Sequence, residues 1–183
     1  MSTIAVFSTR LRYGVVAQFF HWATAILVVA AFMYGPGGSE QRVYSLAKDF
    51  DRQIHETLGM AVLALALIRL AWRAFDGAPD GPPMPLWMRF SSKVVGALLY
   101  ILLLAVPVTA ISGGWLEGHP LTLLGNVRVG PLLTEAHDVG SAIASVHTWL
   151  GDTILWVAGV HAAAALYHHF VLRDGVLRSM LPG

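Results

Sequence analysis

The sequence contains no cysteine among its 183 residues. Disulfides, thiolate metal sites, iron–sulfur clusters and the C-x-x-C-H attachment of c-type haem are therefore excluded. Any metal would have to be held by histidine or by oxygen ligands. Charge is also scarce, because only 13% of the residues are charged against about a quarter in soluble domains. The formal net charge is +1, so we expect no nucleic-acid partner, which would need a broad basic surface.

The sequence is rich in apolar residues. They make up 56% of the chain, and the mean hydropathy is +0.62. A helix needs about 20 mostly apolar residues to cross a bilayer, and four segments reach that length, at approximately 15–34, 55–72, 94–115 and 146–172. We therefore predict an all-α integral membrane protein, with a four-helix transmembrane bundle that forms a single domain over residues 1–183.

The basic residues near the span ends predict the orientation of this bundle. Eight Lys and Arg residues fall on the side that carries both termini, and only four, Arg42, Lys48, Arg52 and Arg128, fall on the other side. Cytoplasmic loops carry the excess of positive charge. Both termini are thus predicted to be cytoplasmic, and the loops 35–54 and 116–145 are predicted to face outward.

Four of the eight histidines occupy matched depths in the predicted spans. His21 lies about two turns inside the cytoplasmic end of the first span, His55 and His147 begin the second and fourth spans on the outer side, and His161 follows His147 by fourteen residues. Fourteen residues amount to about 40° less than four full turns and rise about 21 Å. One face of the fourth span thus carries histidines at two depths, which predicts the pairs His55 with His147 and His21 with His161.

Two cross-helix pairs at two depths suit the axial ligands of two haems. Haem iron accepts imidazoles from opposite sides, and facing helices of a bundle can supply them. A single intramembrane histidine can instead serve only to hydrogen-bond a neighbouring helix. A zinc or di-iron site would cluster its ligands at one depth with carboxylates such as an E-x-x-H repeat, and the spans contain none. We favour a bundle that encloses two haems.

Two further polar residues lie on the same faces as the paired histidines. Arg69 is fourteen residues after His55, so its guanidinium is a candidate to bind a haem propionate, although it could also snorkel to the cytoplasmic surface. His168 is seven residues after His161. It could be a rival haem ligand, a hydrogen-bond donor to a quinone carbonyl, or a solvated histidine at the helix end, and we favour the quinone role.

These stretches together resemble the bacterial cytochrome b561 family of small four-helix, di-haem membrane proteins. The similarity covers nearly the whole chain. It is carried by R-Y-G-x-x-x-Q-x-x-H-W at 12–22, I-H-x-x-x-G at 54–59, I-R-L-A-W-R at 68–73 and G-V-H-A-A-A-A-L-Y-H-H at 159–169. The resemblance implies two haem b groups whose axial ligands are His21, His55, His147 and His161, in a bacterial inner membrane.

The resemblance also indicates a function. The family includes a superoxide oxidase that passes electrons from superoxide outside to ubiquinone in the membrane, and it is similar to the cytochrome b subunits of hydrogenases and dehydrogenases. We therefore expect an oxidoreductase that joins superoxide at the outer face to membrane quinone. The alternatives are a cytochrome b subunit that links a partner enzyme to the quinone pool, and a non-redox membrane protein such as a transporter. No catalytic residue is assigned.

The outer loops contain two histidines and a group of charges. For His119 and His137 we expect a plain loop role, since the neighbouring His137 and Asp138 are weak grounds for a metal site. Three basic residues just before His55 could form a positive patch that attracts superoxide. They could instead pair with nearby carboxylates. The residues concerned are Arg42, Lys48 and Arg52 on one side and Glu40, Asp49, Asp51 and Glu56 on the other.

Overall fold

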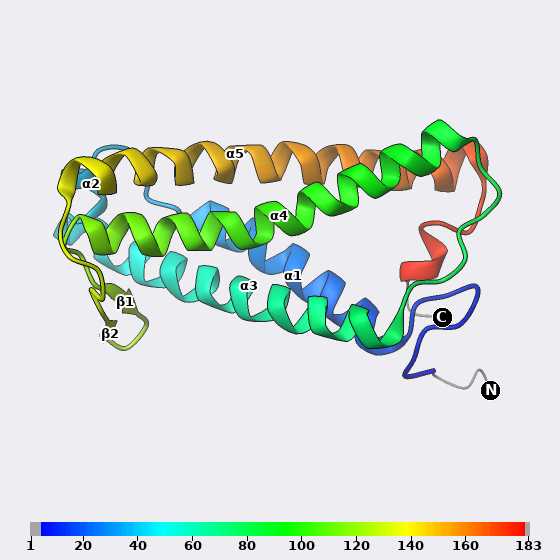
Figure 1. The fold of residues 1–183 in the computed structure, drawn as a ribbon, viewed down its shortest axis with the longest axis horizontal. Helices are drawn as coiled ribbons and strands as arrows, with labels where there is room; N and C mark the ends of the chain where they lie inside the picture. The colour runs from blue at the N-terminus through cyan, green and yellow to red at the C-terminus, as the bar shows by residue number, and fades with distance from the viewer. Residues whose placement is uncertain (1–4, 182–183) are drawn as a thin grey trace.

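The computed structural model describes residues 5–181, and within them four long helices lie side by side (Figure 1). They are α1 (Val15–Tyr34), α3 (Asp49–Asp76), α4 (Leu86–Leu116) and α5 (His137–Tyr167). All four are long and apolar enough to cross a membrane. The prediction of an all-α membrane protein with a four-helix bundle is confirmed.

Three of these helices begin earlier than the predicted spans. α3 starts six residues before His55, α4 starts eight residues before Val94, and α5 starts at His137, nine residues before Val146. Hydropathy locates only the stretch that a bilayer can hold, whereas a helix continues through polar residues beyond it, where its backbone hydrogen bonds still form. The predicted loop over 116–145 was therefore too long, because residues 137–145 belong to α5.

Short elements connect the long helices. The α1–α3 connection contains α2 (Glu40–Val43) and a 3₁₀ turn at Leu46–Lys48, and the α4–α5 connection contains a small antiparallel hairpin of β1 (Leu121–Leu123) and β2 (Val127–Val129). These connections lie together at one end of the bundle, on the left of Figure 1. We call this end the loop end. The segments before α1 and after α5 lie at the opposite end, which we call the terminal end.

The hairpin is held on the first turns of α3 by side chains. Gly125 and Asn126, both with positive φ, turn the chain, as these residue types do at low cost. The Asn126 side chain then accepts a hydrogen bond from Gln53 at 3.2 Å. The Glu56 carboxylate accepts one from the Thr122 backbone N–H, and the Thr57 hydroxyl accepts another from the Leu124 backbone N–H. These hydrogen bonds hold the hairpin against the part of α3 that carries His55.

The helices pack as two pairs. α1 lies against α3 and α4 lies against α5, whereas in the described part of the chain α5 makes no extensive contact with α1 or α3. Near the loop end α4 and α5 approach closely at Gly113. A Cβ added there would lie only 3.0 Å from the Ala144 nitrogen. The small buried core joins three helices and consists of Val62, Ala66, Leu102, Leu103 and Ile154. Space therefore remains between α5 and the α1–α3 pair.

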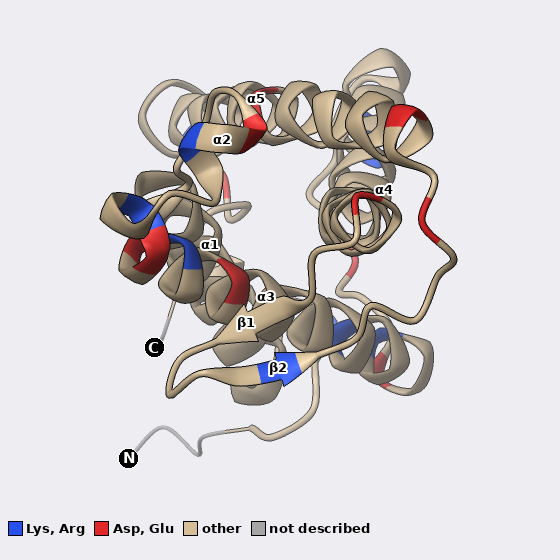
Figure 2. Cartoon of the chain, turned by 90° about the vertical axis from the view of Figure 1, so that its left-hand side faces the viewer, with Lys and Arg blue, Asp and Glu red and all other residues tan. Residues whose placement is uncertain are grey.

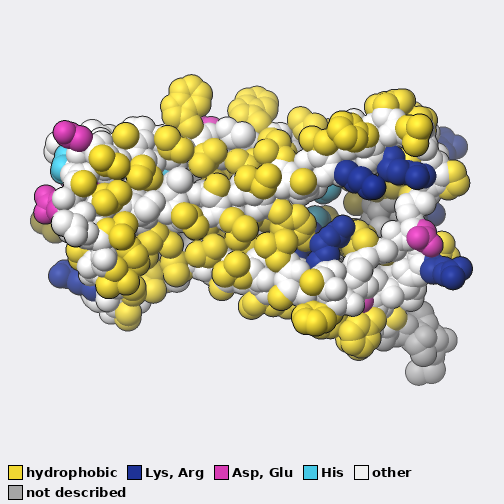
Figure 3. All heavy atoms as spheres, in the orientation of Figure 1, with side chains coloured by type: hydrophobic (Ala, Val, Ile, Leu, Met, Phe, Trp, Pro, Cys, Tyr) yellow, Lys and Arg dark blue, Asp and Glu magenta, His cyan; other side chains and the backbone are white. Residues whose placement is uncertain are grey.

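Charge and apolar surface divide along the bundle. Apolar side chains cover the long helices, and Lys and Arg gather toward the terminal end (Figure 3). Large side chains such as Phe19, Ile101, Trp149 and Trp156 are more than 60% exposed. Exposed aromatic and aliphatic side chains over the length of a helix suit contact with lipid.

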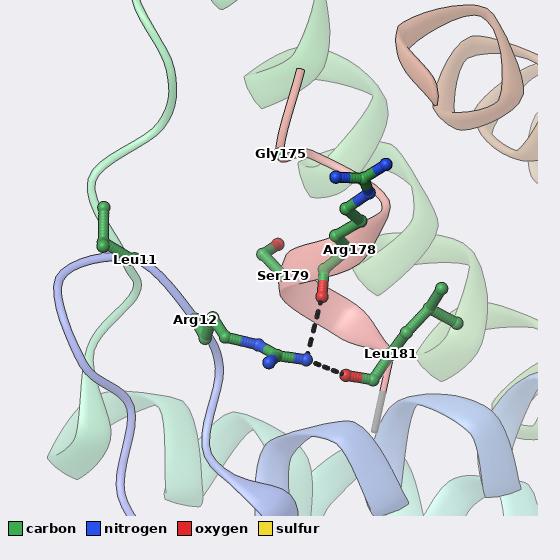
Figure 4. Close-up of a pocket in the computed structure, with 6 residues that line it drawn as sticks. All are labelled: Leu11, Arg12, Gly175, Arg178, Ser179 and Leu181. Carbon is green, nitrogen blue, oxygen red and sulfur yellow. Dashed lines mark hydrogen bonds between the residues drawn. The ribbon is translucent and has the colours of Figure 1, made fainter. Parts of the chain in front are cut away.

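At the terminal end, residues of the first matching motif hold the C-terminal segment against α1. The Arg12 guanidinium donates to the carbonyls of Arg178 and Leu181, the latter at 2.7 Å (Figure 4). Trp22 Nε1 donates to the Met180 carbonyl at 2.9 Å. Gln18 also reaches this segment, so three side chains of the 12–22 motif anchor residues 178–181 beside His21.

Candidate functional site

The first histidine pair lies at the loop end, and both of its rings are held by backbone carbonyls. The ring centroids of His55 on α3 and His147 on α5 are 6.0 Å apart. His55 Nδ1 lies 2.7 Å from the carbonyl of Ala31, and His147 Nδ1 lies 2.9 Å from the carbonyl of Val106. A carbonyl can only accept, so each Nδ1 carries a proton and each Nε2 keeps a free lone pair. That is the tautomer a metal ligand needs.

The Ala31 carbonyl is available because α1 ends there. The last four carbonyls of a helix have no partner within it, and α1 ends at Tyr34. Gly35 N–H turns back to the Phe32 carbonyl, which leaves the Ala31 carbonyl for His55. Gly35 also keeps the approach open, because a Cβ there would lie 3.4 Å from the His55 ring. The end of one span thus sets the orientation of a histidine on the next.

The second pair lies nearer the terminal end. The ring centroids of His21 on α1 and His161 on α5 are 6.2 Å apart. The structure therefore brings together the same two pairs that the sequence spacing predicts. Their role as haem ligands is a separate matter and stays a prediction.

Both separations suit two imidazoles on opposite sides of one metal ion. Two metal–nitrogen bonds of about 2.0 Å, with each ring centre about 1 Å behind its nitrogen, place the ring centroids about 6 Å apart. The distances at both pairs thus fit a metal held between the rings, and a haem iron is such a metal.

Room for a flat ring exists beside the loop-end pair. Gly59 and Gly151 each follow a histidine by four residues and so lie on its helix face. A Cβ at either glycine would meet nothing within 4 Å. Toward the terminal end, Figure 3 shows histidine side chains within a recess between the helices. The residues present therefore fit a haem.

Arg69 is partly buried, and its guanidinium turns toward the second pair. Its Nη2 is 3.1 Å from His21 Nδ1, and its guanidinium carbon is 5.3 Å from the centre of the Tyr100 ring on α4. The guanidinium thus bridges α1, α3 and α4 beside the second pair. A cation in this place can bind a propionate, so the propionate role stays a prediction and the snorkelling alternative is set aside.

His168 begins a π-helical turn, His168–Leu172, that continues α5. Its side chain is 9% exposed, so the alternative of a solvated histidine is wrong. His168 Nδ1 lies 2.5 Å from Asp174 Oδ2. Burial acts to raise the pKa of Asp174, but hydrogen bonds from His168 and the Val176 N–H outweigh it and lower that pKa. The carboxylate therefore stays charged at neutral pH and orients the imidazole.

The basic residues before His55 are mostly engaged by carboxylates. Lys48 Nζ lies 2.8 Å from Asp51. Arg52 contacts Asp49 at 2.5 Å and Glu56 at 2.9 Å, and it is 8% exposed. Of the two alternatives, pairing with carboxylates therefore holds for Lys48 and Arg52, and a patch of unpaired positive charge does not.

Sequence reasoning missed a cluster at the loop end. Glu40, Glu117, His119 and His137 come together there, although Glu40 is 79 residues from His119 and 97 residues from His137. The residues stand in the connections or at the first residue of a helix, without a shared periodic pattern, so nothing in the sequence indicated their meeting. The backbone carbonyls of Ala31 and Val106, which hold His55 and His147, were also missed.

Comparisons with known proteins agree with this arrangement. A sequence model of the prokaryotic cytochrome b561 family matches residues 12–183. The chain is 27% identical to "Cytochrome b561 homolog 2" of Escherichia coli over 95% of this chain and 93% of that protein. It is 28% identical to a "Probable superoxide oxidase CybB" of Yersinia pestis, over 93% and 96%, and 28% identical to a "Cytochrome b562" of Cereibacter sphaeroides, over 88% and 89%. The chain therefore belongs to the prokaryotic cytochrome b561 family, whose members are membrane electron-transfer proteins.

Proposed function

We propose that the chain binds two b-type haems and carries electrons from superoxide, at the loop end, to membrane quinone, at the terminal end. The observation that carries the proposal is the presence of two cross-helix histidine pairs with ring separations of 6.0 and 6.2 Å. His55 and His147 would hold one haem, and His21 and His161 the other. When bound, each haem supplies an iron that accepts and gives up single electrons.

Backbone carbonyls orient the ligands of the first pair, and a side chain supplies charge beside the second pair. The Ala31 and Val106 carbonyls fix the tautomers of His55 and His147, so that both Nε2 atoms could bind a metal. Arg69 supplies a positive charge beside the second pair. That charge would offset the negative charge of a propionate.

Quinone reduction also needs protons, and His168 can supply one. The imidazole is buried, and its Nδ1 lies against the charged Asp174 carboxylate, which orients the ring. The second nitrogen would donate to a quinone carbonyl and pass a proton to it. The position, seven residues after His161 on a π-helical turn, places this donor one short step beyond the second pair.

We place the terminal end in the cytoplasm of a bacterial inner membrane. Segments 5–14 and 173–181 lie together at that end, where the Tyr13 N–H donates to the Ser179 carbonyl at 3.1 Å. Basic residues favour the cytoplasmic side, and eight of the twelve lie toward this end. They are Arg10, Arg12, Arg69, Arg73, Arg89, Lys93, Arg173 and Arg178.

The choice of superoxide as donor is supported by a relative whose name is "Probable superoxide oxidase CybB", 28% identical. The experiment is to purify the full chain, measure haem per chain, and follow haem reduction by enzymatically generated superoxide, with and without superoxide dismutase. We expect two haems, with reduction that the dismutase abolishes. Adding ubiquinone should then reoxidise them.

The same purification tests the alternative of a cytochrome b subunit. Haem that superoxide does not reduce, together with a second protein that copurifies in equal amount, would favour that alternative. A preparation without haem would contradict both and leave a non-redox membrane protein.

A further inference from the structure

Four metal-ligating side chains from three separate segments meet at the loop end. Glu40 is the first residue of α2, Glu117 and His119 follow α4, and His137 is the first residue of α5. Glu40 Oε1 lies 2.8 Å from His119 Nε2, and Glu40 Oε2 lies 3.0 Å from His137 Nε2. The ligand atoms of Glu40, Glu117 and His119 all lie within 4.8 Å of one another. Figure 2 looks onto this end and shows acidic positions on α2 and at the end of α4.

The donor set is that of a borderline divalent cation. Zinc is bound in proteins by imidazole nitrogens at about 2.0–2.1 Å and by carboxylate oxygens at about 2.0–2.2 Å, in tetrahedral sites. Two imidazoles and two carboxylates supply four such ligands. Calcium and magnesium prefer oxygen alone, so the two histidines favour zinc or a similar transition metal.

The two carboxylates of the cluster have no cationic side chain to neutralise them. Among the ion pairs of residues 5–181, Glu40 pairs only with the two histidines and Glu117 has none. Burial and the neighbouring Glu40 raise the pKa of Glu117, while the hydrogen bond from His119 lowers the pKa of Glu40. Two carboxylates this close repel each other unless a cation lies between them.

The surroundings hold the ligands in place before any metal binds. The Tyr44 ring stacks on the His119 ring, with centroids 3.5 Å apart. The backbone of His119 is fixed by its N–H, which donates to the Gly114 carbonyl at 2.8 Å. Gly118, with a φ of +82°, makes the turn between Glu117 and His119. The side chains of Glu40 and His119 are 28% and 31% exposed, so an ion can reach them from solvent.

We propose that Glu40, Glu117, His119 and His137 form a binding site for a divalent transition-metal cation, with zinc as the best fit. Binding would replace the hydrogen bonds between Glu40 and the histidines by bonds from both partners to the ion. It would join α2 to the α4–α5 connection and so clamp the two outer connections together.

The site is tested by titrating zinc chloride into the purified full-length protein, prepared without a polyhistidine tag and stripped of metal. Calorimetry should show one zinc ion per chain, and magnesium should bind far more weakly. Glu40→Gln and His119→Gln should each weaken zinc binding by at least about tenfold, since even indirect contacts to a metal contribute that much. Glu135→Gln, an exposed change in the same connection, should leave the affinity unchanged.

Folding of each variant is checked by its helical circular dichroism. A third variant, His137→Gln, should disturb the fold least, because the His137 side chain is 52% exposed. Its loss should still weaken zinc binding. Zinc should also raise the thermal unfolding midpoint of the unmodified protein more than that of Glu40→Gln. No zinc binding at about 100 µM, far above the range of structural zinc sites, would overturn the proposal. So would equal affinity in all the variants.

Discussion

The two histidine pairs have nearly the same ring separation but very different surroundings. At the loop-end pair, backbone carbonyls of α1 and α4 hold both Nδ1 atoms. At the second pair, the polar neighbour of His21 is the Arg69 guanidinium, 3.1 Å from its Nδ1. A carbonyl only accepts hydrogen bonds, whereas a guanidinium only donates them. The first pair is thus fixed in the ligand tautomer by the protein alone.

At the second pair, His21 would reach the ligand tautomer only when a haem is bound. While Arg69 donates to His21 Nδ1, the proton of that neutral imidazole must sit on Nε2, which is the nitrogen a metal would need. A bound haem would resolve this conflict, because its propionate gives the guanidinium another partner. Arg69 would then leave His21 free to change tautomer. Backbone carbonyls thus fix the tautomers at the loop-end pair before a haem binds, whereas at the second pair the tautomer of His21 depends on the partner of Arg69.

The largest expected effect comes from removing one ligand of each pair in turn. Replacing His147 with Leu removes an axial ligand, so the protein should retain one haem per chain instead of two. The remaining spectrum should be that of the haem held by His21 and His161. His161→Leu is the matched variant and should give the complementary spectrum. Haem content per chain is measured after extraction of the pigment.

The two variants distinguish the pairs only if each haem can be lost without the other. Loss of both haems in His147→Leu would mean that the bundle needs the loop-end haem to fold. Full retention of two haems would remove His147 from the ligand set.

The next largest effect concerns the acceptor. His168→Leu should slow reduction of ubiquinone by at least about tenfold, the lower range of a general acid's contribution, without changing the haem spectrum. Tyr167→Phe is the neighbouring control, because its ring is exposed, and it should react at the normal rate. Rates are measured by stopped-flow reoxidation of the reduced haems.

Asp174→Asn sharpens the same test. It keeps the size of the side chain that orients His168 but removes its charge, so we expect an intermediate rate. A spectrum altered as in loss of an axial ligand in His168→Leu would make His168 a ligand and overturn the pairing.

Arg69 should affect one haem and not the other. A positive charge near an iron stabilises the reduced form, so Arg69→Gln should lower the potential of the second haem by about 50–100 mV, the size of a unit charge several ångströms away at an effective dielectric constant near 20. The loop-end haem should keep its potential. Arg73→Gln, an exposed change one turn later, is the control. Redox titration that shows both haems shifted equally would contradict the assignment of Arg69 to the second pair.

The parts of this architecture that repeat along helices could be predicted from the sequence. The apolar runs predicted four spans, and the fourteen-residue spacing of His147 and His161 predicted which histidines would face one another. Helical periodicity converts sequence distance into depth and direction, so these predictions needed no knowledge of the connections.

The parts that depend on helix ends and loops could not be predicted. The free carbonyl of Ala31 depends on α1 ending at Tyr34, and a helix end cannot be located from hydropathy alone. The hairpin at 121–129 and the meeting of Glu40 with His119 and His137 depend on how two connections fold over each other. Pairing of Arg52 with Asp49 and Glu56 was weighed from the sequence, but only the structure shows the guanidinium buried between them.

The smallest expected effect is that of salt on electron entry at the loop end. Steering of an anion needs net positive charge near the site, but residues 35–60 and 117–138 contain seven carboxylates and only four cationic side chains. Two of those cations, Lys48 and Arg52, are already paired. Raising the salt to 1 M shortens the Debye length to about 3 Å and screens exposed charge. Reduction of haem by superoxide should therefore change by less than about twofold, and Arg128→Gln, on the exposed strand β2, should change it as little. A rate that falls severalfold with salt would show that attraction by the remaining cations outweighs the carboxylates, and the loop end would then differ from the second pair in using charge to draw in its donor.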